Sequence, residues 1–264
     1  MKRTILERRT KYITDHNILH GFLLLSVDFR NSVFRQRQLY GTINQTHKTN
    51  MPISKRKPRI AIIGTGRMAK ALGKSFLQVG HFVAFGSRQP ETKNIFHEEV
   101  GTDSRIYGVQ AAIDAGEIII IALPHHEVAN TVRKFASSLR NKVVIDITNP
   151  FDAQPNDGSS SAQVTASIIG KGATVVAAFK TNFEKTFENV NDSTGKPREV
   201  LFASDDEKVK TIIKELIYSI GFKPIDCGTL AQAVVLDHMV PLLIRLDSKE
   251  LDGKHDLTFK LINK

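Results

Sequence analysis

A glycine-rich turn between an apolar strand and a helix constrains this chain more than any other feature of its sequence. Residues 59–63 read Arg-Ile-Ala-Ile-Ile, an apolar run typical of a buried strand. The run stops at Gly64, and residues 68–79 then carry the apolar spacing of a helix that ends before Gly80. A buried strand followed at once by a tight turn and a helix predicts the start of a βαβ unit.

Strand-like and helix-like segments continue to alternate along the chain. Strands joined by helical crossovers predict a mostly parallel sheet with helices on both faces. The expected fold class is therefore α/β, a Rossmann-type doubly wound sheet extended by C-terminal strands and helices. We expect Pro241 to kink or break the last helix. The further strands are expected at 81–85, 117–123, 142–147, 174–179, 199–203 and 222–226, and the further helices at 128–139, 162–169, 205–220 and 231–246.

The first 58 residues differ in character from the rest. Residues 1–50 hold nine Lys or Arg against three Asp or Glu, and they show no sustained apolar period. We expect residues 1–58 to be a flexible basic extension, with translation from Met51 or an organellar targeting segment as alternatives. The Rossmann core is expected at 59–180, and residues 181–264 are expected to continue the same domain.

Composition excludes several classes of protein. Cys227 is the single cysteine, so a disulfide framework within the chain and a cysteine zinc cluster are excluded, and we expect no metal. No apolar run approaches the roughly 18–20 residues that a membrane-spanning helix needs. Beyond residue 50, 28 Lys or Arg face 24 Asp or Glu, which is too even for a dedicated nucleic-acid binder. These features favour a reducing compartment, and we expect a cytoplasmic protein.

The glycine turn matches the dinucleotide-binding pattern G-x-G-x-x-G/A in the required context of strand and helix. Gly64 permits the tight turn, Gly66 lets the backbone approach a pyrophosphate, and Ala69 permits close packing of helix on sheet. The helix N-terminus adds free N–H groups and a partial positive charge. The residues expected to contact the cofactor here are Gly64, Thr65, Gly66, Arg67 and Met68.

The end of the second predicted strand indicates which dinucleotide binds. NAD enzymes place an Asp or Glu about 20 residues beyond the glycine pattern, where it binds the ribose 2′-hydroxyl. This chain has Gly86-Ser87-Arg88 at that place. A hydroxyl and a guanidinium suit a 2′-phosphate instead, and we expect Arg67 to add to the same pocket. The predicted cofactor is therefore NADP(H).

Further site residues are expected at the carboxyl ends of the other strands, where ligands bind in open α/β sheets. Leu123 and Pro124 are expected to pack against the nicotinamide, and Asn149 to bind its carboxamide or ribose. Phe179 is expected at the same crevice. Lys180, which could attract an acidic acceptor or stabilise charge on a reduced ring, and His125, which could donate a proton, are the candidate catalytic groups; a surface or capping role is the alternative for His125.

The motifs named so far, together with the second half of the chain, resemble the coenzyme F420-dependent NADP oxidoreductases and the cytosolic reductase domains of six-transmembrane metalloreductases. That resemblance implies hydride transfer between NADP(H) and a flavin-like ring, deazaflavin or flavin, as a small-molecule electron acceptor, and it implies a homodimer. Lys180 departs from the metalloreductase pattern, which has Asn there. The matching stretches are residues 62–66, 80–81 with 86–88, 146–150, 176–179, 221–228 and 241–243.

Two other readings remain open. A β-hydroxyacid or imine reductase shares the glycine pattern but needs a long all-helical second domain. About 80 residues follow Thr181, and part of them reads as strand, which argues against that class. The second reading is a sensor that binds NADP(H) without turnover and signals to a partner.

Overall fold

The computed structural model describes residues 56–262 except 92, 102, 152–157 and 173, and it leaves the side chains of residues 93–95 undescribed. These residues belong to one compact unit, Ser54–Lys264. Nearly all of the predicted extension at 1–58 lies outside the described residues, so the expectations about it and about Met51 stay predictions.

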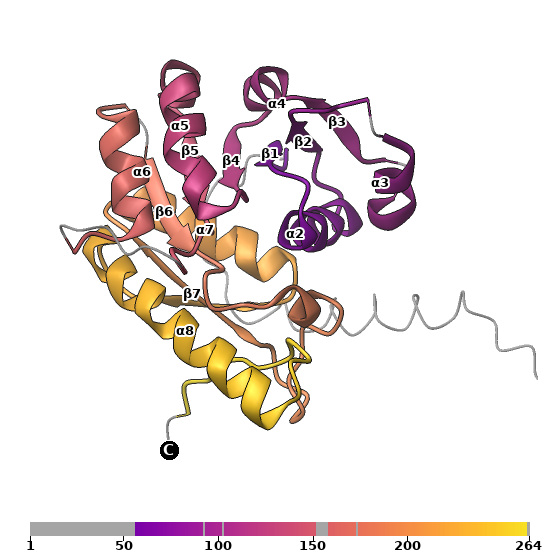
Figure 1. Cartoon of the computed structure of the whole chain (residues 1–264), viewed down its shortest axis with the longest axis vertical. Coiled ribbons are helices and arrows are strands. Elements are labelled where there is room, and N and C mark those ends of the chain that lie inside the picture. The colour runs from indigo at the N-terminus through magenta and orange to yellow at the C-terminus, as the bar shows by residue number, and fades with distance from the viewer. Residues whose placement is uncertain (1–55, 92, 102, 152–157, 173, 263–264) are drawn as a thin grey trace, which may run out of the picture. The chain divides into compact units, whose positions relative to one another are not determined.

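An eight-stranded sheet forms the centre of this unit (Figure 1). Its order is β3-β2-β1-β4-β5-β6-β7-β8, and every neighbouring pair is parallel except β6 with β7. The predicted fold class is confirmed, because β7 and β8 extend a doubly wound parallel sheet. The strands are β1 Ile60–Ile63, β2 Val83–Ser87, β3 Arg105–Gly108, β4 Ile118–Ile121, β5 Val143–Asp146, β6 Thr174–Ala178, β7 Glu199–Ser204 and β8 Lys223–Asp226.

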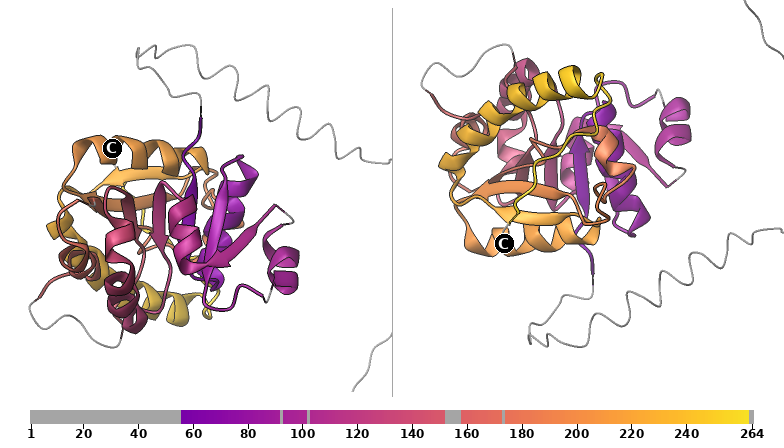
Figure 2. Two further views of the ribbon diagram at one scale, coloured as in Figure 1. Left: turned by 90° about the horizontal axis from the view of Figure 1, so that it is seen from above. Right: turned by 90° about the horizontal axis from the view of Figure 1, so that it is seen from below.

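Helices cover both faces of the sheet (Figure 2). Ile60 and Ile62 of β1 pack on the face covered by α2, α3 and α7, while Ala61 and Ile63 pack on the face covered by α4, α5, α6 and α8. This alternation buries both sides of each central strand, as expected for a parallel sheet. The helices are α2 Arg67–Gln78, α3 Lys93–Val100, α4 Val109–Ala115, α5 His125–Leu139, α6 Ser161–Ile169, α7 Glu207–Ser219 and α8 Ala233–Glu250.

The strand order reverses at β1, which lies between β2 and β4. Ile63 at the end of β1 is in register with Gly86 of β2 and with Ile121 of β4. The loops that follow these three strands therefore open at the same edge of the sheet. Such a reversal at the carboxyl ends of parallel strands is where doubly wound folds bind ligands.

The structure differs from the sequence expectations at three places. The region 89–116 contains α3, β3 and α4, which were not predicted because each is short and lacks a clear apolar period. The predicted break at Pro241 is wrong, since α8 runs through it as one helix. Burial of Val240 and Leu243 beside the proline offsets the lost backbone hydrogen bond. The helix predicted at 205–220 begins at Glu207, because Asp206 caps α7 by accepting from two backbone N–H groups.

Candidate functional site

Two cavities meet at the edge where the strand order reverses. One, of about 640 Å³, is lined by Ser87 and Arg88 and is called the Arg88 cavity here. The other, of about 650 Å³, is lined by Asn149 and part of α8 and is called the Asn149 cavity. Both are lined by the same four residues at their junction. These shared residues are Gly66, Ala122, Leu123 and Pro124.

The two glycines of the turn have different structural roles. Gly64 has φ +126°, and a Cβ there would lie 2.2 Å from the carbonyl oxygen of Ala122, so only glycine fits. Gly66 has φ −74° and ψ −179°, which any residue adopts, and no atom lies within 4 Å of a Cβ built on it. The open space over Gly66 is therefore available to a ligand.

The N-terminus of α2 faces this open space without a side-chain cap. Gly66 is the N-cap residue, and the first turn carries no acidic residue. Uncapped N–H groups with the positive end of the helix dipole form an anion-binding site. Close packing behind the turn depends on Gly73 as well as Ala69, because a Cβ at Gly73 would lie 2.1 Å from the Phe85 ring. Gly73 lies outside the six-residue motif, so the motif does not indicate it.

Ser87 and Arg88 both line the Arg88 cavity, but Arg67 does not join them. Nη2 of Arg88 lies 3.2 Å from Oε1 of Glu127 in α5. Arg67 lines the Asn149 cavity instead, and its Nη1 lies 3.1 Å from Oε1 of Glu184. The expected shared anion pocket of Arg67 and Arg88 is therefore replaced by two separate ion pairs, each with a carboxylate that the sequence did not single out.

Three polar atoms in residues that line the Asn149 cavity are buried and have no hydrogen-bond partner. They are Oδ1 of Asn149, Oδ1 of Asn182 and Nδ1 of His125. Asn149 donates through Nδ2 to the carbonyl of Lys180 at 3.1 Å, which directs its Oδ1 away from that contact. Buried polar atoms without partners are rare and point to a missing ligand or water. Nothing in the local sequence indicated Asn182, which lines the same cavity as Asn149.

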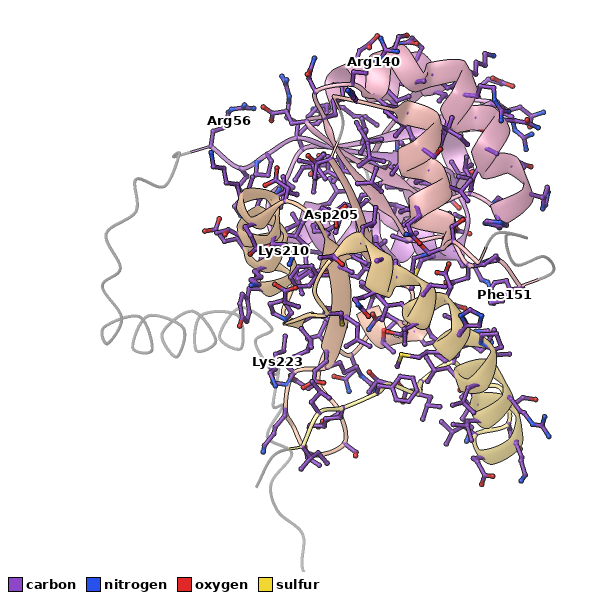
Figure 3. All side chains as sticks on the ribbon, turned by 90° about the vertical axis from the view of Figure 1, so that its left-hand side faces the viewer. Arg56, Arg140, Phe151, Asp205, Lys210 and Lys223 are labelled. Atoms are coloured by element: carbon purple, nitrogen blue, oxygen red, sulfur yellow. The ribbon has the colours of Figure 1, made fainter. Side chains whose placement is uncertain are left out.

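The remaining lining of the Asn149 cavity is largely apolar. Leu123 and Pro124 lie at its junction with the Arg88 cavity. Leu243 and Ile244 reach it from α8. Phe151, labelled in Figure 3, also lines this cavity, and it is 58% exposed. Apolar walls with a few buried acceptors suit a flat heteroaromatic ring.

Phe179 lies in the wall of the Asn149 cavity, but its ring packs in the core. Its ring is 1% exposed and belongs to the core, with its centroid 6.1 Å from that of Phe187. Its backbone has φ +57°, a conformation that bulky residues rarely adopt. This turn carries the chain from β6 past the cavity, so Phe179 shapes the wall rather than offering its ring to a ligand.

Lys180 is the clearest correction to the sequence expectations. Its side chain is 0% exposed, and Nζ lies 2.7 Å from Oδ1 of Asp237 and 3.9 Å from Oδ1 of Asp146. Nζ also donates to Oγ of Ser161 at 2.6 Å and to the carbonyl of Thr148. An ammonium group engaged in this way cannot attract an acidic acceptor or contact a reduced ring. Asp237 lies in α8, and only the packing of this helix brings it close to Lys180.

A second charged group lies at the rim of the Asn149 cavity. Oε1 of Glu184 lies 3.0 Å from Nδ1 of His255, and it also pairs with Arg67. The His255 ring stacks on Phe183 at 5.0 Å between centroids. Burial alone would raise the pKa of Glu184, but the hydrogen bond from His255 and the charge of Arg67 outweigh it, so the pKa is lowered. This carboxylate therefore stays ionised and ties the C-terminal segment to α2.

The described part of the chain contains no group of three or more His, Cys, Asp or Glu side chains that could hold a metal ion. None of its helices is both long and apolar enough to cross a membrane.

Comparisons with known proteins agree with this geometry. Residues 59–150 match the family described as NADP oxidoreductase, coenzyme F420-dependent. The chain is 27% identical over 213 residues to the F420-dependent NADP reductase of Methanocaldococcus jannaschii. The aligned region covers 72% of this chain and 93% of that reductase. It is also 27% identical over 183 residues to metalloreductase STEAP3 of Rattus norvegicus, covering 69% of this chain and 36% of that protein. The chain thus spans about a third of the length of that metalloreductase.

A solved structure supports the fold. A protein from Arthrobacter sp. FB24, described as a candidate F420-dependent NADP-reductase, superposes with a TM-score of 0.69 at 21% identity, over 78% of this chain and 100% of that one. The family model that matches residues 59–150 and the sequence relatives make this chain similar to the NADP oxidoreductases described as coenzyme F420-dependent, and the solved structure supports the same fold.

Proposed function

We propose that this protein transfers a hydride between NADP(H) and a flavin-like ring, either a deazaflavin or a flavin, in the Asn149 cavity. The observation that carries the proposal is the junction of the two cavities at Gly66, Leu123 and Pro124. A dinucleotide site on one side of this junction and an apolar cavity on the other give the cofactor and the acceptor adjoining places.

The residues present fit three parts of the cofactor. Ser87 and Arg88 would hold the 2′-phosphate, and the uncapped N-terminus of α2 over Gly66 would hold the pyrophosphate. Oδ1 of Asn149 would accept from the carboxamide or a ribose hydroxyl. The bound cofactor supplies the hydride chemistry itself.

The protein's own part is orientation and exclusion of water. Leu123, Leu243 and Ile244 provide apolar contacts for a flat ring, and Oδ1 of Asn182 provides a second buried acceptor. Holding two reactants in such a cavity can contribute much of a rate enhancement without an acid–base pair. We further propose that Nδ1 of His125 forms a hydrogen bond with the acceptor ring, because this atom is buried and has no hydrogen-bond partner in the protein.

The first test is turnover of the full chain with different acceptors. Loss of the nicotinamide absorbance band of NADPH would be followed with a deazaflavin, FMN, FAD and a quinone in turn. We expect turnover with a deazaflavin or a flavin, since the Asn149 cavity offers apolar walls and buried acceptors to such a ring. Tight NADPH binding with no turnover on any of these acceptors would contradict the proposal and favour the sensor reading.

Replacing Arg88 with alanine tests the cofactor assignment separately. A charge-assisted hydrogen bond contributes about 1.5–3 kcal/mol, so NADPH affinity should fall by about 10- to 100-fold. NADH lacks the phosphate and should lose less than about threefold in affinity by the same argument. Calorimetric titration of both dinucleotides measures this, with the exposed Arg133 of α5 changed to alanine as a matched control. Equal losses for both dinucleotides would refute the assignment of Arg88.

The cellular location and the oligomeric state expected from the sequence are also proposals. A cytoplasmic location is supported by the single cysteine, and a homodimer by the family resemblance alone. Sedimentation of the purified chain would test the second.

A further inference from the structure

The Arg88 cavity holds a carboxylate as well as a guanidinium. Glu127, in the first turn of α5, lines this cavity, and its Oε1 lies 3.2 Å from Nη2 of Arg88. Among the described residues that line the cavity, Arg88 has the sole positive side chain and Glu127 the sole negative one. The formal charges therefore cancel at the place where a 2′-phosphate would bind.

Glu127 is the better anchored of the two partners. Its side chain is 25% exposed, whereas that of Arg88 is 80% exposed. Its backbone N–H donates to the carbonyl of Pro124, and the N-terminal end of α5 favours a negative charge there. When a ligand enters, Arg88 is the group that can turn toward it, and the carboxylate of Glu127 stays at the wall.

These two groups perform opposite tasks in dinucleotide recognition. A carboxylate at the ribose end accepts a hydrogen bond from the 2′-hydroxyl of NAD(H), and an arginine binds the 2′-phosphate of NADP(H). Building on the proposed dinucleotide site, we propose that Glu127 determines cofactor specificity: it binds the 2′-hydroxyl and repels the 2′-phosphate, so that the site accepts NAD(H) as well as NADP(H).

The electrostatic consequence follows from the charges. A phosphate monoester carries about −1.5 to −2 at neutral pH and would lie within a few ångströms of Glu127. Binding NADP(H) requires Arg88 to be shared with, or released from, this carboxylate. The preference for NADP(H) is therefore smaller than Ser87 and Arg88 would produce alone. Salt should reduce the contribution of Glu127, because the pair is partly exposed.

The test compares the affinities of NADPH and NADH for the full chain and for Glu127→Gln. Glutamine keeps the size and one acceptor oxygen but removes the charge. Removing one charge beside a dianion should tighten NADPH binding by about tenfold. NADH binding should weaken by about fivefold, since glutamine keeps an acceptor oxygen for the 2′-hydroxyl but loses the charge that strengthens this hydrogen bond. The exposed Glu98 of α3, changed to glutamine, is the matched control and should leave both affinities unchanged.

Three results would overturn the inference. They are an unchanged NADPH-to-NADH preference in Glu127→Gln, a lowered preference, and the absence of measurable NADH binding by the unaltered chain. Circular dichroism of each variant would establish that it folds. Failure of the proposed hydride transfer can be told apart from failure of this inference. In that case Glu127→Gln would still shift the NADPH-to-NADH preference, but no acceptor would be turned over.

Discussion

Replacement of Lys180 by methionine is expected to lower the free energy of unfolding by about 3–5 kcal/mol, the cost of removing one partner from a buried ion pair. The methionine fills most of the same space but cannot pair with Asp237, whose side chain is fully buried. Asp146 is less affected, because it also accepts from Thr148 and Thr165. The variant therefore leaves one carboxylate buried without its counter-charge.

The same change should also loosen the loop that carries Asn149. Nζ of Lys180 donates to the carbonyl of Thr148, and the Lys180 carbonyl accepts from Asn149. Loss of the first contact should raise the dissociation constant of the dinucleotide by about tenfold, comparable to one lost hydrogen bond to a charged group. Lys180 thus acts as a positioning residue, in contrast to the direct role suggested by its place in the sequence.

Urea unfolding followed by circular dichroism measures the first effect. The exposed Lys208 of α7, changed to methionine, is the control and should alter stability by less than about 0.5 kcal/mol. A double variant, Lys180→Met with Asp237→Asn, should recover part of the loss, because it removes the stranded charge and keeps an acceptor for the Ser161 N–H. A stability loss below about 1 kcal/mol in the single variant would show that the buried pair is not what holds these elements together.

Replacement of Gly66 by valine is expected to weaken dinucleotide binding by at least about 100-fold while the protein stays folded. The backbone at Gly66 suits any residue, and a Cβ there meets nothing within 4 Å. The added side chain would occupy the space over the N-terminus of α2, where the pyrophosphate has to approach the backbone. Stability should change by no more than about 1 kcal/mol, the cost of a poor N-cap residue.

Calorimetry with NADPH and thermal unfolding should be measured together on this variant. Gly108 provides a matched control, because it is the N-cap of α4, has φ −58°, and also has open space around a built Cβ. Gly108→Val should lose similar stability and keep NADPH affinity. Retained NADPH binding by Gly66→Val would refute the assignment of the glycine turn to the pyrophosphate.

The fold and the cofactor end of the site could be predicted from the sequence because their signals are local. The apolar run into Gly64, the helix after it, and Ser87-Arg88 at the end of the next strand all lie within about 30 residues, and βαβ geometry then determines their arrangement. The short elements between 89 and 116 were missed because tertiary packing, rather than their own periodicity, stabilises them.

The sequence by itself determined a doubly wound sheet with a dinucleotide turn, since hydrophobic period and glycine geometry operate over neighbouring residues. Only the tertiary structure decided which charges meet. It pairs Lys180 with Asp237, Arg88 with Glu127 and Arg67 with Glu184, and it leaves acceptors on Asn149 and Asn182 without partners. The physical reason is that a charged side chain pairs with whatever the fold brings within a few ångströms, and no local pattern records that distance.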